Sequence, residues 1–451
     1  MSDVDTPAVH IPDEARDVPD NWTWHRLEDV CENIFDCPHS TPKKSDVGPL
    51  MARTQDVMTG VFRADQAQRV SEETYTERIK RAEPSVGDLM YSREGTYFGV
   101  AAEVPPNTRV CLGQRMVLIR ANSEILDFRY LRHWLNSPVM ASHIHGYRDG
   151  SVAERLNVST IRGLPTLIPP LAEQRAIASI LGALDDKIEL NRRMNATLES
   201  LARAIFKSWF VDFDPVHANA IRQNAGKTGA GQMPTSSAIP STHDPKVLDL
   251  FPSTFQDSEL GPIPQGWEPI RLESILELAY GKALKKSDRI AGEFPVYGSG
   301  GLTGSHNESL VDGPGVIVGR KGSVGTLYWE DSAFYPIDTV FYVKPRNGRS
   351  LQYIFYLLQT LGLEGMNTDA AVPGLNRNNA YRLEIPNASQ DAMDEFTKVA
   401  TAIRNQIAGN DAEINQLASA RDALLPQLLS GELTVPDALT RADEALIGGS
   451  K

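Results

Sequence analysis

The sequence predicts an α+β protein made of two tandem domains of mixed helix and strand, each followed by a long α-helix. Three observations support this prediction: the chain resembles itself, a heptad pattern follows each of the resembling regions, and a loop-forming segment separates the halves. The two helices are expected to pair as an antiparallel coiled coil with pseudo-two-fold symmetry. A length of 451 residues agrees with this plan, since it exceeds the usual size of one domain.

An internal repeat relates the two halves of the chain. Each half begins with a tryptophan-led strand, continues through glycine-punctuated apolar runs and one amphipathic helix, and closes on a proline step that leads into a long helix. Self-similarity of this kind indicates a tandem duplication. The matched pairs are NWTWHRLEDVCE (21–32) with GWEPIRLESILE (266–277), GDLMYSREG (87–95) with GVIVGRKGS (315–323), and SVAERLNVSTIRGLPTLIPP (151–170) with AAVPGLNRNNAYRLEIPN (370–387).

A heptad pattern runs along residues 171–213 and again along residues 389–431. In both segments the seam positions lie alternately four and three residues apart, which is typical of a coiled coil. The two seams match at one constant offset, which places Asn191 on Asn410. The predicted seams are Ile177, Leu181, Leu184, Ile188, Asn191, Asn195, Leu198, Ala202, Ile205 and Trp209, and Phe396, Ala400, Ile403, Ile407, Asn410, Ile414, Leu417, Arg421, Leu424 and Leu428.

Two asparagines interrupt the first apolar seam, and their positions indicate how the helices pair. A stripe of heptad period is narrow, so it favours pairing of the two helices over packing of each helix on its own domain. If a two-fold axis relates the halves, the helices run antiparallel, Asn195 faces Asn410 and Trp209 faces Phe396. A polar pair in an apolar seam costs stability but specifies register. We therefore expect Asn195 and Asn410 to lie within side-chain reach of each other.

Composition shifts along the chain give the predicted segment boundaries. The linker is rich in Gly, Pro, Ser, Thr and Ala and has little periodicity, as expected for loops. The predicted segments are a disordered acidic tail (1–20), a first domain (21–170), a central long helix (171–213), a linker (214–261, with 224–246 flexible), a second domain (262–388), a C-terminal long helix (389–431) and a tail (432–451).

Composition and charge exclude several classes of protein. No apolar run is long enough to span a bilayer, and the N-terminus lacks the features of a secretory signal, so we expect a cytoplasmic protein without membrane contact. The net charge of −13 argues against binding to nucleic acid through overall charge, although the acid excess lies mainly in residues 1–20 and 391–451. Three cysteines predict no disulfide framework, and Cys37 and His39 lack the further ligands of a zinc site. We expect no metal.

Several motifs resemble those of the DNA-specificity subunit of type I restriction-modification systems. They are PLAEQRAIASILGALDDKIELNRR, RDALLPQLLSGEL, YGSGG, GRKGSVG and AVPGLN, and the resemblance covers nearly the whole chain apart from the tail and the linker. It implies that the two domains are target recognition domains, each of which reads one half of a split sequence in double-stranded DNA. It also implies that the long helices form a spacer between the half-sites and that two methyltransferase (modification) subunits dock around them.

Motifs for catalysis are missing from the sequence. An adenine methyltransferase needs a glycine motif for S-adenosylmethionine and an NPPY- or DPPY-type tetrapeptide, and neither is present. The sequence also lacks GxxxxGK[ST], GxGxxG, a helicase box and a nuclease-type acidic cluster. We therefore expect a subunit that is not an enzyme and binds no cofactor itself. The resemblance implies modification subunits that use S-adenosylmethionine and, in the full complex, restriction (translocase) subunits that use ATP and magnesium.

Candidate DNA contacts cluster beside the glycine-rich turns of the repeat. Base readout needs side chains that hydrogen-bond to base edges, and backbone contacts need cations, although a single Lys or Arg is more often solvated surface. Arg93 and Arg320 recur at equivalent places, which fits either a DNA contact or a contact of the shared fold. Asn157 and Asn376 also recur, and we expect caps or turns there. The candidates are Lys43, Lys44, Ser92, Arg93, Arg148, Lys282, Lys285, Lys286, Tyr297, Ser299, Arg320 and Lys321.

Two alternative functions are compatible with the same sequence. One is a non-enzymatic coiled-coil scaffold that binds protein partners rather than DNA, which would explain the acidic composition and the missing catalytic motifs. Sequence-dependent retardation of DNA by the chain with its methyltransferase would distinguish the two. The other alternative is the specificity subunit of a methylation-only system, which genomic neighbours would identify.

Overall fold

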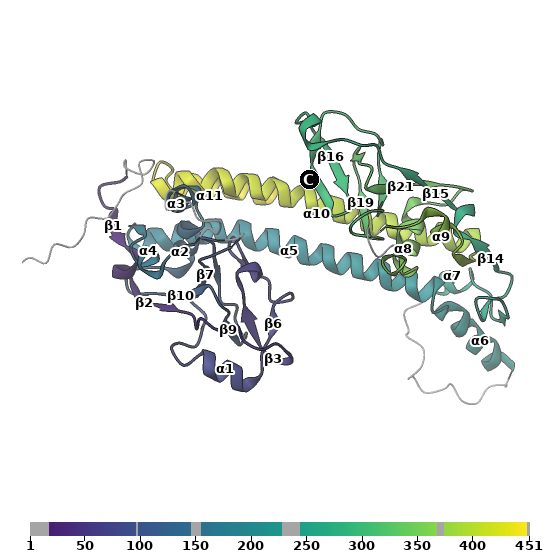
Figure 1. Ribbon diagram of the computed structural model, residues 1–451, viewed down its shortest axis with the longest axis horizontal. Helices are drawn as coiled ribbons and strands as arrows, with labels where there is room; N and C mark the ends of the chain where they lie inside the picture. The colour runs from purple at the N-terminus through teal and green to yellow at the C-terminus, as the bar shows by residue number, and fades with distance from the viewer. Residues whose placement is uncertain (1–17, 96–97, 146–154, 228–243, 368–373, 449–451) are drawn as a thin grey trace, which may run out of the picture. The chain divides into compact units, whose positions relative to one another are not determined.

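The computed structural model describes residues 18–95, 98–145, 155–227, 244–367 and 374–448, which belong to two compact units (Figure 1). Unit 1 comprises residues 1–191 and 412–451, and unit 2 comprises residues 192–411. Each unit thus combines one mixed domain with a part of each long helix. Within the described ranges, no helix is both long and apolar enough to cross a membrane.

The core of unit 1 is an antiparallel sheet of four strands. One of its two inner strands, β7 (Asp88–Ser92), is buried on every residue, because DLMYS is largely apolar and lies between two neighbouring strands. Helix α2 (Phe128–Leu135) covers this core and is capped by Asp127, whose carboxylate accepts the N–H groups of Arg129 and Tyr130. In order across the sheet the strands are β2 (Cys31–Asp36), β10 (Met116–Ala121), β7 (Asp88–Ser92) and β8 (Ala101–Glu103).

Smaller elements complete unit 1. The indole of Trp134 on α2 donates to the carbonyl of Pro165 at 2.9 Å, which ties this helix to the strand that precedes the first long helix. The remaining strands are β1 (Thr23–Arg26) paired with β11 (Pro165–Ile168), β6 (Gln68–Arg69), β3 (Ser45–Ala52) and β9 (Val110–Leu112) in one sheet, and β4 (Val57–Met58) with β5 (Val61–Phe62). The helices are α1 (Glu72–Arg78), α2 (Phe128–Leu135), α3 (Pro138–His145), α4 (Val158–Arg162) and α11 (Val435–Gly448).

Unit 2 repeats the central architecture of unit 1, as the predicted duplication requires. A four-stranded antiparallel sheet again carries a capped helix, and a two-stranded pair again leads into the long helix. The sheet order is β15 (Leu276–Tyr280), β21 (Val340–Pro345), β18 (Gly315–Gly319) and β19 (Leu327–Glu330), and the pair is β14 (Glu268–Arg271) with β22 (Glu384–Asn387). The helices are α6 (Asp214–Lys227), α7 (Pro245–Leu248), α8 (Leu351–Thr360) and α9 (Arg377–Tyr381).

The additional sheet differs between the units. Unit 2 has β17 (Gly301–His306), β16 (Phe294–Gly298) and β20 (Tyr335–Pro336) in one sheet, and β12 (Phe255–Gln256) with β13 (Ile263–Pro264). In unit 1 the corresponding addition is the β6-β3-β9 sheet. The common frame therefore carries different peripheral structure in each half.

Two long helices, α5 (Leu171–Phe210) and α10 (Gln390–Ser430), pack together as predicted. In unit 1, Asp185 pairs with Arg421 and Asn191 donates to Glu413, so partner numbers fall as α5 residue numbers rise. In unit 2, Asn195 contacts Asn410, and Trp209 lies against Phe396 with ring centroids 6.2 Å apart, so partner numbers fall again. Both segments of the pair are therefore antiparallel, which confirms the predicted fold class.

The polar layer of the helix pair lies where the sequence places it. The side-chain amide of Asn410 donates to the carbonyl oxygen of Asn195 at 2.7 Å, and Asn195 donates in turn to Asp411 at 2.7 Å. Asn191 is buried and donates to Glu413 at 2.8 Å. The predicted contact between Asn195 and Asn410 is confirmed, and the NH2 group of each of the three asparagines has an acceptor, whereas the side-chain oxygen of Asn191 is buried without a hydrogen-bond partner among the described residues.

The apolar seam departs from the heptad pattern near the end of α5. Phe206 and Phe210 are buried in an aromatic cluster, whereas the predicted seam residue Ile205 is half-buried. A straight α-helix has 3.6 residues per turn, so residues spaced by 3.5 on average move gradually around its surface. Here the aromatic side chains of unit 2 also bury the positions beside the predicted seam.

Two predicted segments need correction. The linker 214–261 contains α6, α7 and β12, with Val216 and Ala218 of α6 buried. Its flexible part, 224–246, overlaps the end of α6 and the start of α7, while 228–243 lie outside the described residues. The predicted tail 432–451 contains α11 (Val435–Gly448), because Leu433, Ala438 and Ala442 complete the core of unit 1. The acidic tail 1–20 is described only from residue 18.

Candidate nucleic-acid interface

Loops from distant parts of unit 2 meet on the segment 336–339. The main-chain N–H of Lys282 donates to the carbonyl of Pro336 at 3.0 Å, and that of Ser299 donates to the Thr339 hydroxyl at 3.3 Å. The N–H groups of Arg320 and Lys321 donate to the carbonyl of Thr339 at 2.9 and 3.1 Å. Four candidate residues from three motifs are thereby brought to one place, which we call the 336–339 loop cluster.

Glycines allow this close approach. A Cβ on Gly281 would lie 2.1 Å from the carbonyl oxygen of Ile337, and one on Gly319 would lie 2.0 Å from that of Ser323. Real side chains do not tolerate such distances, so both positions require glycine for main-chain packing. The glycine-rich motifs YGK and GRKG are explained by the architecture of the cluster, and they place Lys282 and Arg320 at its surface.

Arg320 also lines a polar cavity of about 260 Å³ that we call the Tyr280 cavity. Tyr280 is 52% exposed, and the Arg320 and Arg377 guanidinium carbons lie 5.4 and 4.9 Å from its ring centroid. The Nε and Nη2 groups of Arg320 donate to the carbonyl of Asp338, which orients the guanidinium. The residues that line the cavity are Tyr280, Arg320, Phe341, Leu375, Asn376, Arg377 and Asn378.

Arg377 and the segment 336–339 are absent from the sequence-based candidates. Arg377 directly follows Asn376, which had been assigned a capping role, and the segment 336–339 carries no glycine-rich motif. Asn376 does cap α9, accepting the N–H groups of Asn378 and Asn379 at 2.9 and 3.3 Å. Asn157 occupies the N-cap position of α4 without a side-chain cap bond. A cap followed by an arginine was the available signal for Arg377.

The other candidates of unit 2 differ in accessibility. Lys285 and Lys286 are exposed at a short 3₁₀ turn. Tyr297 is half-buried and its hydroxyl donates to Glu330 at 2.8 Å, so burial together with this carboxylate raises its pKa above the usual range. The two lysines are free to meet a phosphate, whereas Tyr297 has a structural partner.

Two of the five candidates of unit 1 lie in the interior of the unit. Ser92 is fully buried, and Arg93 is 4% exposed with its guanidinium 3.7 Å from the carboxylate of Asp36. These two candidates are therefore corrected to interior positions. Lys43 and Lys44 are exposed ahead of β3, and Arg148 lies outside the described residues.

The recurrence of Arg93 and Arg320 has a structural explanation. The carbonyl of Arg93 accepts the N–H of Leu156 at 2.9 Å, and the carbonyl of Arg320 accepts the N–H of Leu375 at 2.8 Å. The same main-chain contact thus joins the same two motifs in both units. Of the two explanations left open by the sequence, the shared fold contact accounts for the repeat.

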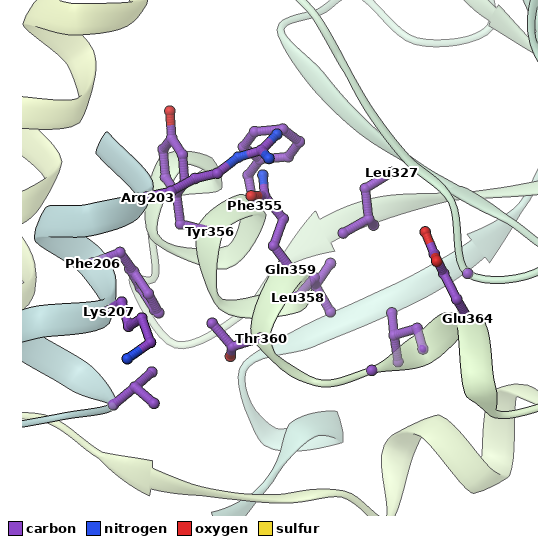
Figure 2. A pocket seen from close by; sticks show the side chains of 14 residues that line it. Arg203, Phe206, Lys207, Leu327, Phe355, Tyr356, Leu358, Gln359, Thr360 and Glu364 are labelled. Atoms are coloured by element: carbon purple, nitrogen blue, oxygen red, sulfur yellow. The ribbon is translucent and has the colours of Figure 1, made fainter. Parts of the chain in front are cut away.

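A second concavity in unit 2 has a volume of about 650 Å³ and lies beside the C-terminal part of α5 (Figure 2). Figure 2 shows Arg203, Phe206 and Lys207 on α5 opposite Phe355, Tyr356 and Gln359 of α8. Its lining combines aromatic surface with two exposed cations. This groove differs in chemistry from the Tyr280 cavity, which is mainly polar.

No metal centre is apparent among the residues that the structure describes, where no three His, Cys, Asp or Glu side chains come together. Burial raises the pKa of Cys31 to about 12 and that of Cys111 to about 11, and it also raises the pKa of Cys37. The three thiols are therefore protonated at neutral pH and are poor metal ligands as they stand.

Comparison with known proteins identifies consistent relatives. A family model described as the type I restriction modification DNA specificity domain matches residues 19–200 and 264–397. The specificity subunit of the type I restriction enzyme HindI from Haemophilus influenzae is 24% identical over 405 residues, covering 77% of this chain and 86% of that protein. The MjaIX specificity subunit from Methanocaldococcus jannaschii is 21% identical over 456 residues, covering 93% and 95%.

A solved structure supports the fold. The crystal structure of a type I restriction-modification system S subunit from M. genitalium aligns with a TM-score of 0.53 and 16% sequence identity. The alignment covers 92% of this chain and 96% of that chain. The likeness therefore extends over both domains and both long helices.

Proposed function

Because this chain belongs to the family of type I restriction modification DNA specificity domains, we propose that each of its units reads one half of a bipartite target in double-stranded DNA. The chain is the specificity subunit of a type I restriction-modification system. The observation that supports two different half-sites is the pairing of a common frame with unlike loops. Equivalent four-stranded sheets carry the β6-β3-β9 sheet in unit 1 and the β17-β16-β20 sheet in unit 2.

This arrangement suits readout of two sequences by one chain. A shared sheet and capped helix hold the loops rigidly, while differences between the loops change the hydrogen-bond donors and acceptors offered to base edges. In unit 2 the 336–339 loop cluster holds Lys282 and Lys321, and the Tyr280 cavity is lined by Arg377. In unit 1 the exposed pair Lys43 and Lys44 precedes β3 instead. The two half-sites are therefore expected to differ in sequence.

The chemistry of the system is assigned to partner subunits. We propose that this chain is not catalytic, binds no cofactor, and docks two methyltransferase subunits that use S-adenosylmethionine. In a full complex, restriction subunits would supply ATP- and magnesium-dependent translocation. Family membership supports a role in DNA specificity over a scaffold that binds only proteins. A methylation-only system would use the same subunit in the same way.

Methylome sequencing tests the proposed function directly. Cells that carry the intact gene are compared with cells in which it is deleted and with deleted cells complemented by the gene. We expect one bipartite methylated motif to vanish on deletion and to return on complementation, since the motif is chosen by this subunit. Identical methylation in all three strains would refute the proposal for this chain.

The long helices are proposed to set the gap between the half-sites. A heptad inserted after Asn191 in α5 and another after Asp411 in α10 would fall at the boundary of the two units and preserve the seam register. Seven residues add about 10 Å of helix, on the order of three base-pair steps, so the gap should lengthen by about that amount. Motif mapping is the measurement. The same seven residues appended after Lys451 should leave the gap unchanged, and altered half-sites would contradict the spacer role.

A further inference from the structure

We propose that the Tyr280 cavity of unit 2 binds one phosphate of the target DNA backbone, and that the equivalent place in unit 1 does not. The inference rests on the proposed function, since it assumes that unit 2 contacts DNA. It adds an asymmetry that the duplicated fold does not suggest: one half-site is held by a cationic backbone contact that the other half-site lacks. Phosphate contacts position a protein on the duplex and set its salt dependence.

The cavity has the chemistry of an anion site. Two guanidinium groups, those of Arg320 and Arg377, flank the exposed ring of Tyr280 within 5.4 and 4.9 Å of its centroid. Among the described residues neither forms an ion pair with a carboxylate, and both donate to main-chain carbonyls, Arg320 to Asp338 and Arg377 to Leu278. Arg320 is anchored by the carbonyl of Asp338, so its guanidinium group is held in place beside the cavity. A phosphate would balance the positive charge of the two guanidinium groups that line the cavity.

A phosphate fits this site better than a base edge. Arg320 is held at a main-chain contact that recurs in both units, next to the N–H of Leu375, so its position follows the common frame. The chemistry of the DNA phosphates does not vary with sequence. A side chain whose position is fixed by the shared fold is therefore better matched to a phosphate than to one particular base. The Nε and Nη2 groups of Arg320 already donate to Asp338, which occupies one edge of its fork.

Strand pairing identifies the equivalent residues of unit 1. Tyr280 pairs with Phe341 on β21, and Asp36 pairs with Val117 on β10, in matching places of the two sheets. Lys321 and Glu94 form the corresponding isolated bridges, with Gly374 and with Arg155. Arg377 and Val158 each follow the N-cap asparagine of a short helix. Unit 1 therefore has Asp36, Arg93, Glu94 and Val158 where unit 2 has Tyr280, Arg320, Lys321 and Arg377.

These substitutions reverse the electrostatics of the site. In unit 1, Asp36 lies 3.7 Å from the buried guanidinium of Arg93, and Glu94 pairs with Arg115 at 3.3 Å. The arginine that is exposed to the cavity in unit 2 is thus neutralised in the interior in unit 1. Two carboxylates at this place would repel a phosphate. Among the described residues, the arginines at this place in unit 2 therefore have no carboxylate partner, whereas in unit 1 the arginine there is paired with a carboxylate.

Salt dependence of DNA binding tests the inference. The chain assembled with its methyltransferase subunits is titrated into a fluorescent mixed-sequence duplex and into a duplex that carries the motif found by methylome sequencing. Arg377→Gln is expected to make the slope of log K against log salt about 0.9 less steep, which is the loss of one phosphate contact. The decrease should be the same for both duplexes, since a phosphate contact is independent of sequence.

Two matched variants make the result interpretable. Lys344→Gln removes an equal charge from an exposed residue at the far end of β21 and should leave the slope unchanged. Arg377→Lys keeps the charge and should retain the wild-type slope. Thermal unfolding of each variant checks that unit 2 is intact.

The outcomes separate the inference from the proposed function. Equal slopes for Arg377→Gln and Lys344→Gln would overturn the phosphate site while the wild-type complex still selects its motif. Relaxed preference at one base position with an unchanged slope would overturn it in favour of base readout. A wild-type complex that binds both duplexes equally would instead contradict the proposed function.

Discussion

Replacing Phe206 by Ala should lower the free energy of unfolding of unit 2 by about 3–5 kcal/mol. Phe206 is 1% exposed, and its ring centroid lies 5.0 Å from that of Phe210 and 5.2 Å from that of Phe396. Truncation removes these contacts and leaves a cavity that rigid neighbours on α8 and α10 cannot fill. Hydrogen exchange resolved by peptide measures the loss separately in the two units.

Ile205→Ala is the matched control for this prediction. Ile205 occupies the seam position that the heptad pattern predicts, yet it is only half-buried. Its truncation should cost about 1–2 kcal/mol, because less apolar surface returns to water. A larger loss for Ile205→Ala than for Phe206→Ala would show that the heptad seam, rather than the aromatic cluster, carries the packing of unit 2.

Acidification below about pH 6.5 should destabilise unit 1 through His133, by up to about 1.4 kcal/mol per pH unit. His133 is 5% exposed, and burial, aided by the charges of Arg132 and Arg421, lowers its pKa well below 6.5. The folded state keeps the ring neutral, while the unfolded chain takes up a proton. This contribution to stability is therefore complete above pH 6.5 and decreases as the pH falls below it.

The geometry around His133 explains why the ring stays neutral. Nη2 of Arg132 donates to Nε2 of His133 at 2.9 Å and also pairs with Asp185 at 3.2 Å, so the ring nitrogen serves as an acceptor. Glu103 also contacts Arg132, and burial raises the pKa of this carboxyl, which acts in the opposite direction at lower pH. Comparison with His133→Gln isolates the histidine from this opposing group.

Unfolding of the wild type and His133→Gln is compared from pH 8 to pH 5 by hydrogen exchange of unit 1 peptides. The difference in stability between them should be constant above about pH 6.5 and change below it, in favour of the variant. A difference curve for His133→Gln that stays flat would mean that His133 is not held neutral in the folded protein.

Local sequence features predicted the repeat, the long helices and their polar layer. Asn195 and Asn410 could be paired from the sequence because both lie on a seam of constant period, and the structure places them 2.7 Å apart. The same regularity failed for Phe206, because three-dimensional packing against α8 and α10 decides which side of a helix is buried. The sequence pattern also did not predict α11, which is stabilised because its alanines Ala438 and Ala442 are buried in the core of unit 1.

The candidate interface was predicted only in part. Glycine-rich motifs marked Lys282, Ser299, Arg320 and Lys321, and the structure brings them together on the segment 336–339. That segment and Arg377 have no distinctive local signal. Their roles depend on contacts between residues far apart in the chain, such as the carbonyl of Arg320 with the N–H of Leu375.

The sequence by itself determined the features that are periodic or repeated. These are the internal duplication, the two heptad seams and the motifs that resemble those of a known family. What the tertiary structure decided was exposure. Arg93 and Arg320 are equivalent in the sequence, yet Arg93 is buried against Asp36 while Arg320 borders an open cavity beside Tyr280. The physical reason is that the partner of a charge is set by the neighbouring strand, and Asp36 and Tyr280 occupy that place in the two units.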